Sequence, residues 1–233
     1  MNDRRIPKTL RATWFPLSLL LCAVGADQGT FAQSYSWGWA QGINGTDDEE
    51  VADLVIDNAT GAVYSVGYTK SNGIISTTLG SILGNQDAFL VKYSAAGAVV
   101  WGFTPSGLGE SQATGVALDA AGNIYITGWF KNTIDLHGLS ALGAGILISS
   151  GGEDCYLASY APEGLLRWCT KLGGTNDERP VGVAVSSNGV YALGTVKTNI
   201  TTAFGSIPAT LPNGKLNLVL AKYSLLGVGQ SLI

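Results

Sequence analysis

Acidic side chains recur at one place in the sequence, shortly after each apolar segment that carries a tryptophan. The first group is Asp47-Asp48-Glu49-Glu50 with Asp53, and Glu110 and Asp177-Glu178 stand at equivalent places further along. Carboxylates could bind calcium, which needs several oxygen ligands that converge on one point. The sequence contains no Asp-x-Asp-x-Asp-Gly loop. Because the group recurs, we expect structural carboxylates that accept hydrogen bonds from backbone amides, with no metal and no cofactor.

Catalytic groups are few. A serine triad would need His137, the single histidine, as its base, yet no Gly-x-Ser-x-Gly elbow is present. We therefore expect His137 to be an exposed bystander. Asp57 and Asp119 recur in turns, and Asp87 and Asp154 recur before apolar strands. Catalytic carboxylate pairs need unequal environments, whereas repeats supply similar ones. We expect no catalytic residue and no enzyme.

Cys155 and Cys169 could form a disulfide. They remain if an N-terminal leader is removed, and an exported chain meets an oxidising compartment. They lie on two strands joined by a short hairpin, but the register places Cys169 opposite Tyr156 or Leu157. A disulfide needs Cα atoms within roughly 7 Å of each other. A bridge and two buried free thiols therefore both stay open.

Two tryptophans, Trp37 and Trp129, fall outside the repeat described below. The tryptophans and tyrosines at fixed repeat positions are expected to pack between repeats. Trp37 and Trp129 are therefore the candidates for a binding surface. The loops 69–86, 129–153 and 195–216 vary in length, and recognition in such scaffolds concentrates on loops.

All these residues are carried by a repeat. Trp39, Trp101 and Trp168 each stand 18 positions before an equivalent residue, and these residues are Asp57, Asp119 and Ser186. Successive copies start 62 and 67 residues apart. Each copy has four short β-branched or aromatic runs separated by glycine-containing turns, which indicates antiparallel strands. Self-similarity of this kind marks stacked units that are each too small to bury their own apolar face.

The predicted fold is all-β, with three four-stranded antiparallel meanders of the β-propeller blade type. The blades are expected at about residues 51–103, 114–171 and 181–232 of a repeat domain that covers 33–233. Ser34–Ala40 matches the fourth strand of a blade and has no three strands before it, so it is an orphan strand. We expect an incomplete propeller, since closed ones have four to eight blades.

The N-terminus predicts export. Four basic residues precede the apolar run Trp14–Val24, which is too short to span a bilayer. We expect residues 1–32 to be a signal peptide cleaved after Ala32, with Ala26 as the alternative site. The chain would then be secreted or held at the cell surface, with no membrane span. Its net charge would be −6, which argues against nucleic acid as a partner.

The repeat resembles a known family. Its best stretches are Gly173–Glu178, Val116–Gly128 and Asp87–Tyr93, and the likeness covers about residues 35–233. The pattern of these stretches resembles the bacterial seven-bladed β-propeller (SBBP) repeats, which are related to NHL-type propeller repeats. The resemblance implies secreted or surface proteins, often with a C-terminal sorting domain that this sequence lacks. Ser186 replaces the recurring Asp in the third copy, so that Asp is not needed in every blade.

Two functions follow from this sequence. The first is a secreted, non-catalytic module that binds or scaffolds a protein or glycan through a propeller face. The alternative is a carbohydrate-binding or carbohydrate-active propeller, because aromatic-lined faces can hold sugars. Three blades would leave apolar faces open, so we expect either a fragment of a longer protein or self-association through open blade edges. Of these two alternatives, we expect a fragment of a longer protein.

Overall fold

The computed structural model describes residues 38–42, 45–70, 86–197, 201–202, 205–206 and 215–232. Trp37–Ile233 is one compact unit, and Met1–Ser36, which includes the expected signal peptide, lies outside the described residues. The described residues are strands and turns, and they include no helix long and apolar enough to cross a membrane.

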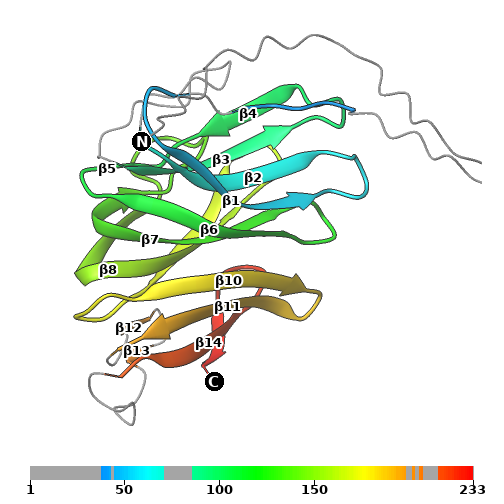
Figure 1. Ribbon diagram of the computed structural model, residues 1–233. Coiled ribbons are helices and arrows are strands. Elements are labelled where there is room, and N and C mark those ends of the chain that lie inside the picture. The colour runs from blue at the N-terminus through cyan, green and yellow to red at the C-terminus, as the bar shows by residue number, and fades with distance from the viewer. Residues whose placement is uncertain are drawn as a thin grey trace, which may run out of the picture. The chain divides into compact units, whose positions relative to one another are not determined.

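Three antiparallel sheets follow one another along the chain, as Figure 1 shows. We call them blades 1, 2 and 3. Blade 1 contains β1 (Glu49–Ile56), β2 (Val63–Thr69), β3 (Asp87–Tyr93) and β4 (Val99–Phe103). Blade 2 contains β6 (Ser111–Leu118), β7 (Ile124–Asp135), β8 (Ile146–Tyr160) and β9 (Leu166–Leu172). Blade 3 contains β10 (Arg179–Ser186), β11 (Gly189–Val196), β14 (Asn217–Tyr223) and β15 (Gly229–Leu232). The predicted all-β fold of propeller-type blades is confirmed.

The second and third strands of blade 2 are longer than the sequence suggested. Residues expected in a loop continue the ladder past a bulge, and Thr133 pairs with Ile148. The short strand β5 (Ser106–Gly107) adds to the edge of this extension. Apolar Ile134 and Leu147 explain why it forms, because both pack in the core next to Phe103 of blade 1. In blade 3 the small pair β12 (Thr201–Thr202) and β13 (Gly205–Ser206) occupies the corresponding stretch of sequence.

The first strands of the three blades share one irregularity. A bulge interrupts the pairing at Val51/Asp53 in β1, at Ala113/Gly115 in β6 and at Pro180/Gly182 in β10. At this point successive blades approach closely, and a Cβ added to Gly115 would lie 3.3 Å from the Gly182 Cα. The absence of a side chain at both glycines therefore permits this approach.

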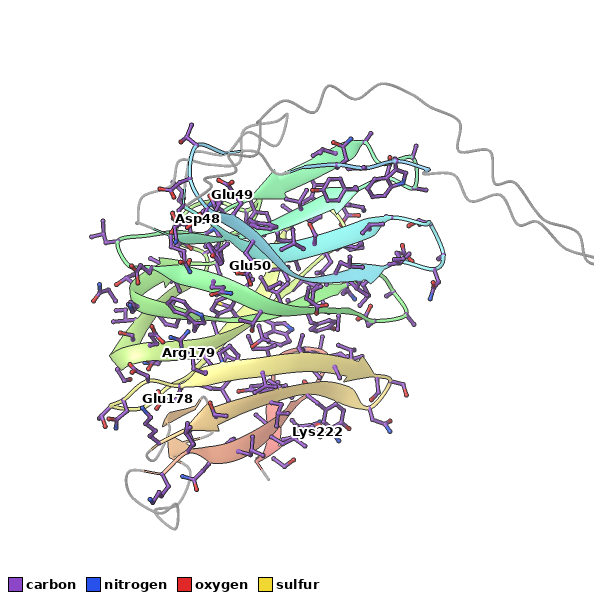
Figure 2. The ribbon with its side chains drawn as sticks, in the orientation of Figure 1. Asp48, Glu49, Glu50, Glu178, Arg179 and Lys222 are labelled. Atoms are coloured by element: carbon purple, nitrogen blue, oxygen red, sulfur yellow. The ribbon has the colours of Figure 1, made fainter. Side chains whose placement is uncertain are left out.

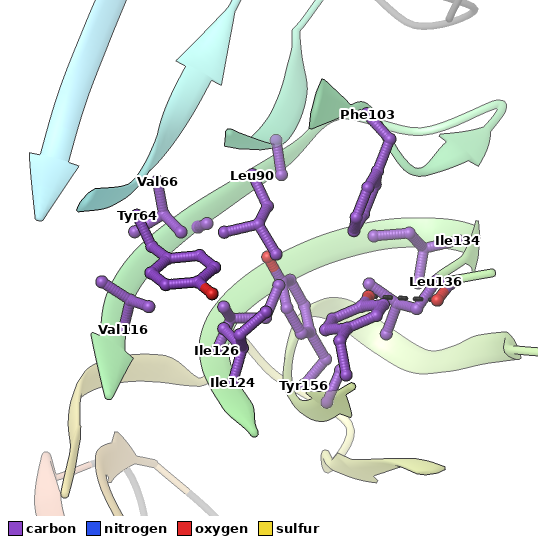
Figure 3. Packing of buried hydrophobic residues seen from close by; sticks show 14 of the residues in the cluster. Tyr64, Val66, Leu90, Phe103, Val116, Ile124, Ile126, Ile134, Leu136 and Tyr156 are labelled. Atoms are coloured by element: carbon purple, nitrogen blue, oxygen red, sulfur yellow. Dashed lines mark hydrogen bonds between the residues drawn. The ribbon is translucent and has the colours of Figure 1, made fainter. Parts of the chain in front are cut away.

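The core lies between blades. One cluster joins Tyr64, Val66 and Leu90 of blade 1 to Ile126 and Tyr156 of blade 2 (Figure 3). A second joins blade 2 to blade 3, and includes Tyr125, Cys155, Leu157, Val190, Val219 and Tyr223. Burial of each large apolar side chain contributes about 1.5–3 kcal/mol. A single blade would lose most of this contribution, because the partners of its apolar faces lie in its neighbours.

A tryptophan ties the fourth strand of blade 1 to blade 2, and another ties the fourth strand of blade 2 to blade 3. The indole nitrogen of Trp101 donates to the carbonyl oxygen of Pro162 at 3.3 Å, and that of Trp168 donates to Leu225 at 3.1 Å. Both acceptors lie in the hairpin between the third and fourth strands of the following blade. Trp168 also stacks on Tyr223, with 6.2 Å between ring centroids.

The orphan segment at the N-terminus repeats this contact. Its described part, Gly38–Ala40, has no strand pairing, and residues 34–37 lie outside the described residues. Trp39 nevertheless donates to the carbonyl oxygen of Ala95 at 3.1 Å and stacks on Tyr93 at 6.0 Å. Trp39 therefore contacts blade 1 as the tryptophan of a preceding blade would.

Candidate functional site

A group of charged side chains surrounds Trp129 where blade 2 meets blade 3. It lies near the bulge in β7, the part of β8 around Glu153 and the loop that leads into β10. Its members are Glu110, Trp129, Lys131, Glu153, Asp154, Lys171, Glu178 and Arg179. We call this group the charged cluster. Figure 2 shows Glu178 and Arg179 at the end of the strands where Asp48, Glu49 and Glu50 also lie.

Trp129, a candidate for a binding surface, lies inside this cluster. Its side chain is only 6% exposed. The Arg179 guanidinium lies 4.5 Å from the ring centroid, and the Lys131 ammonium lies 5.7 Å from it. Two cations therefore cover the ring by cation–π contact. A ligand could stack on Trp129 only after displacing Arg179, so the ring is no open binding surface. Trp37, the second candidate, lies outside the described residues.

The cations around Trp129 are paired with carboxylates. Lys131 Nζ lies 2.7 Å from Glu110 Oε2 and 3.4 Å from Glu153 Oε1, and Arg179 pairs with the second oxygen of Glu153. The hydrogen bond to Glu110 is the main reason that the pKa of Lys131 is raised. The ion pairs link β7, β8 and the start of β10, and therefore join blade 2 to blade 3.

Beneath these pairs lies a buried carboxyl pair, Asp154 and Glu178, with both side chains shielded from solvent. Asp154 accepts from the backbone amide of Ser150 at 2.6 Å and pairs with Lys171 at 3.3 Å. Glu178 accepts from the amide of Gly174 at 2.7 Å. Burial, followed by the charge of Asp154, raises the pKa of Glu178 to about 7. Near neutral pH the Glu178 carboxyl can therefore bind or release a proton.

The acidic residues before blade 1 use their oxygens on separate partners. Asp47 accepts from the amide of Asp48 at 2.8 Å, and Asp48 pairs with Lys70 at 3.0 Å. Asp53 accepts from the amide of Val116 in blade 2 at 3.0 Å. These bonds are of the structural kind predicted for the recurring carboxylates. Within the described residues, no three His, Cys, Asp or Glu side chains are gathered in a way that could hold a metal ion.

The cysteines do not meet. In the ladder, Cys155 lies opposite Leu172 and Cys169 lies opposite Ala158, so the two are three positions out of register. Cys155 packs in the core toward blade 3, whereas Cys169 packs against the core toward blade 1. Among the described residues, Cys155 and Cys169 are therefore free thiols with no bridge between them. Burial raises the pKa of both thiols, that of Cys169 to about 11.

His137 is less exposed than expected. Its side chain is half-buried, and Nδ1 lies 3.1 Å from the carbonyl oxygen of Asp135. The Asp135 carboxylate accepts from the amides of Gly143 at 2.5 Å and Gly145 at 3.1 Å. His137 therefore belongs to a loop that Asp135 organises.

At the opposite end of the blades, shallow grooves lie between successive turns that join first and second strands. One groove of about 480 Å³ lies between Asp119–Ala121 and Ser186–Ser187, and another of about 400 Å³ lies between Asp57–Ala59 and the turn at Asp119. Burial pushes the pKa of Asp119 upward, but hydrogen bonds from Asn123, Tyr125 and Ala121 outweigh it and lower that pKa. The Asp119 carboxylate therefore stabilises its own turn.

The sequence reasoning missed Lys131 and Arg179. A signal was present for the first, because Lys70 and Lys131 stand at equivalent places in the first two copies. The backbone amide of Lys70 donates to the main-chain carbonyl oxygen of Asp48 at 3.0 Å, and that of Lys131 donates to the main-chain carbonyl oxygen of Glu110 at 2.9 Å. No signal of this kind pointed to Arg179, which has no basic counterpart in the other copies.

Comparison with known proteins finds a distant likeness to a curated protein. No family model matches the chain. The chain is 24% identical over 178 residues to "Regulatory protein FlaEY" of Caulobacter vibrioides (strain ATCC 19089 / CIP 103742 / CB 15). The aligned region is 75% of this chain and 18% of that protein, so the chain spans less than a fifth of the relative's length.

Proposed function

We propose that this chain is a secreted or cell-surface, non-catalytic β-propeller repeat module that binds or scaffolds a protein or glycan. One observation carries the proposal: the polar groups that recur in the repeat make structural hydrogen bonds and ion pairs, either within a blade or between blades. Trp39, Trp101 and Trp168 each donate to a hairpin of the next blade. The grooves between turns, and the loops, then remain as surfaces for recognition.

The likeness to a regulatory protein supports a modular role. That relative is more than five times as long as the aligned region, because the region is 18% of it. A repeat array of this size inside a larger protein is suited to presenting a surface. The SBBP resemblance supports the same role and an exported location.

Export is tested by intact-mass measurement of the product from a bacterium that expresses the full chain. We expect the mature protein outside the cytoplasm, beginning near Gln33. Retention of Met1 in the folded product would refute the location.

Binding and catalysis are tested together on the purified exported chain. A glycan array and incubation with plant, fungal and bacterial polysaccharides form the two arms. We expect no polysaccharide turnover. Release of new reducing ends, abolished by substitution of a single carboxylate, would replace this proposal with the carbohydrate-active alternative. Saturable glycan binding without turnover would identify the ligand of the module as a glycan.

A further inference from the structure

Lys171 of β9 lies against two buried carboxyls of the charged cluster, and we call Lys171, Asp154 and Glu178 the lysine–carboxyl triad. Nζ of Lys171 lies 3.3 Å from Oδ2 of Asp154. It also donates to the carbonyl oxygen of Ile148 at 2.6 Å and to Oγ of Ser150 at 2.7 Å. An ammonium group has three N–H donors, so these contacts fix its position and leave one donor for Asp154.

The two carboxyls of the triad meet in a place that is shielded from solvent. Oδ1 of Asp154 and Oε1 of Glu178 have no hydrogen-bond donor in the described part of the chain. The two side chains nevertheless lie within hydrogen-bonding range of each other. Since adjacent buried carboxylates cannot both stay ionised, a proton on Glu178 satisfies these two oxygens. The Asp154 carboxyl thus has an amine on one side and a carboxylic acid on the other.

The junction of blades 1 and 2 offers a comparison. Asp87, Thr104 and Ser111 stand there, each 67 positions before a member of the triad. The amides of Ser111 and Glu178 donate to the carbonyl oxygen of the residue before the Asp, at 2.9 and 2.6 Å, so the places are equivalent. The Asp is kept, and both of its neighbours differ. An ion pair would need the lysine alone, whereas burial of a further carboxyl costs free energy.

We propose that Lys171 and Asp154 become joined by an intramolecular amide bond, with Glu178 as the acid that transfers the protons. The ammonium group first passes one proton to Oδ2 of Asp154, which leaves a neutral amine whose lone pair faces the carboxyl. Nζ then attacks Cγ, while Glu178 protonates Oδ1 and takes a proton from Nζ. The tetrahedral centre collapses as the Cγ–Oδ2 bond breaks, and Oδ2 leaves as water.

The atoms and charges of this step balance within the chain. Two of the three ammonium protons leave with the water, the third stays on the amide nitrogen, and Glu178 ends with its own proton. The positive charge of Lys171 and the negative charge of Asp154 disappear together. The step needs no oxidant, reductant or second substrate. Each chain forms the bond once, so the inference goes beyond the proposed non-catalytic function and stands without it.

Intact-mass measurement of the purified exported chain tests the bond. After incubation at about pH 6, where Glu178 is largely protonated, we expect the wild type to be one water lighter than its sequence. Lys171→Arg keeps a cation beside Asp154 and should keep its full mass, as should Glu178→Gln. Lys131→Arg is the matched control, because Lys131 is also paired with a carboxylate but lies outside the triad, and it should still lose one water.

Two further readouts separate a bond from an ion pair. Trypsin should no longer cleave after Lys171, because an amide has replaced the amine, and the peptides that contain Lys171 and Asp154 should be recovered as one linked product. Asp154→Asn should release ammonia in place of water. Its linked chain should therefore have the same final mass as the linked wild type.

The rate of bond formation should follow the protonation of Glu178. The groups that face Glu178 are Asp154 and Cys155 from β8 and Asp177 from its own segment, and Asp154 leads on to Lys171 of β9. We expect the bond to form about ten times faster at about pH 6 than at about pH 8, since the protonated fraction of Glu178 changes by that factor. The raised pKa of Glu178 belongs to the unlinked chain, which rapid purification at about pH 8 preserves for comparison.

A wild-type chain that keeps its full mass after prolonged incubation, and that trypsin cleaves after Lys171, would overturn the proposal. A loss of water that persists in Lys171→Arg would also overturn it, because the water would then come from another place. Bond formation in Glu178→Gln as fast as in the wild type would refute the role of Glu178. Circular dichroism confirms that each variant is folded. The export and glycan measurements decide the proposed binding role separately.

Discussion

Trp168 of blade 2 donates its indole N–H to the carbonyl oxygen of Leu225 in blade 3, over 3.1 Å, and its ring lies over Gly227. Gly227 has a φ of 80°, and a Cβ there would lie 2.5 Å from the ring. The hairpin therefore needs a glycine both for its backbone and for the tryptophan above it. Trp168 in blade 2 thus restricts which residue can stand at position 227 in the hairpin of blade 3.

Removal of this hydrogen bond should destabilise the junction of blades 2 and 3. Trp168→Phe keeps an aromatic ring but leaves the Leu225 carbonyl without the indole donor, so we expect a loss of about 1 kcal/mol in the free energy of unfolding. Urea unfolding followed by circular dichroism measures it. Trp39→Phe removes the same kind of bond at the exposed N-terminal segment and should cost less. Equal stability of Trp168→Phe and wild type would contradict the structural role of the bond.

The Asp53 carboxylate should stabilise the junction of blades 1 and 2. Asp53→Ala leaves the amide of Val116 without its 3.0 Å acceptor, and we expect destabilisation of about 1–2 kcal/mol. Hydrogen exchange at Val116 should accelerate in this variant. Asp47→Ala is the control, because Asp47 accepts from the neighbouring amide of Asp48 and should leave that exchange unchanged. If the Val116 amide exchanges as slowly in Asp53→Ala as in the wild type, Asp53 does not stabilise the junction of blades 1 and 2.

Stability should fall as the pH rises through neutrality because of Glu178. Its pKa in the folded chain is about 7, above its ordinary value of 4.5. A raised folded-state pKa contributes stability that is fully present below about pH 4.5 and is lost as the pH rises through about 7. At about pH 8, Glu178→Gln should be more stable than the wild type by on the order of 2 kcal/mol, because the amide imitates the protonated acid.

Denaturant unfolding at a series of pH values measures this effect. The charged groups that raise the pKa of Glu178 include Asp154 and Asp177, and Asp154 is in turn paired with Lys171. Asp177→Asn serves as the control, since its carboxylate contributes less to the raised pKa of Glu178 than Asp154 does. Parallel pH curves for Glu178→Gln and wild type would show that the carboxyl pair has no such influence.

The blades could be predicted from the sequence because their signals are local and repeated. Each strand begins or ends at a turn with glycine, such as Gly122 or Gly164, and both have positive φ in the structure. The blade expected at about 51–103 corresponds to β1–β4, and the blade expected at about 181–232 contains β10, β11, β14 and β15. Local propensity and the spacing of the repeat pointed to the same elements, which is the condition for reading a fold from sequence.

The charged cluster could not be predicted to the same degree, because it depends on contacts between blades. Trp129 looked like a free aromatic in the sequence, and its cover comes from Arg179, which lies 50 positions away. The extension of β7 and β8 was missed because serines and glycines at 149–152 suggest a loop, whereas the ladder is paired on both sides of them, at Ile148 with Thr133 and at Glu153 with Lys131. Tertiary context decided both cases.

The last prediction concerns the thiols of the exported chain. Cys155 and Cys169 lie out of register and on opposite sides of their sheet, so titration of the denatured, unreduced protein should find two free thiols. In the folded chain both should react slowly with a disulfide reagent at neutral pH, because burial raises both pKa values and the thiolate is the reacting species. Cys169, the less buried of the two, should react first, and Cys169→Ala should remove this phase. A denatured protein without free thiol would show that the two strands pair in a different register from the one described.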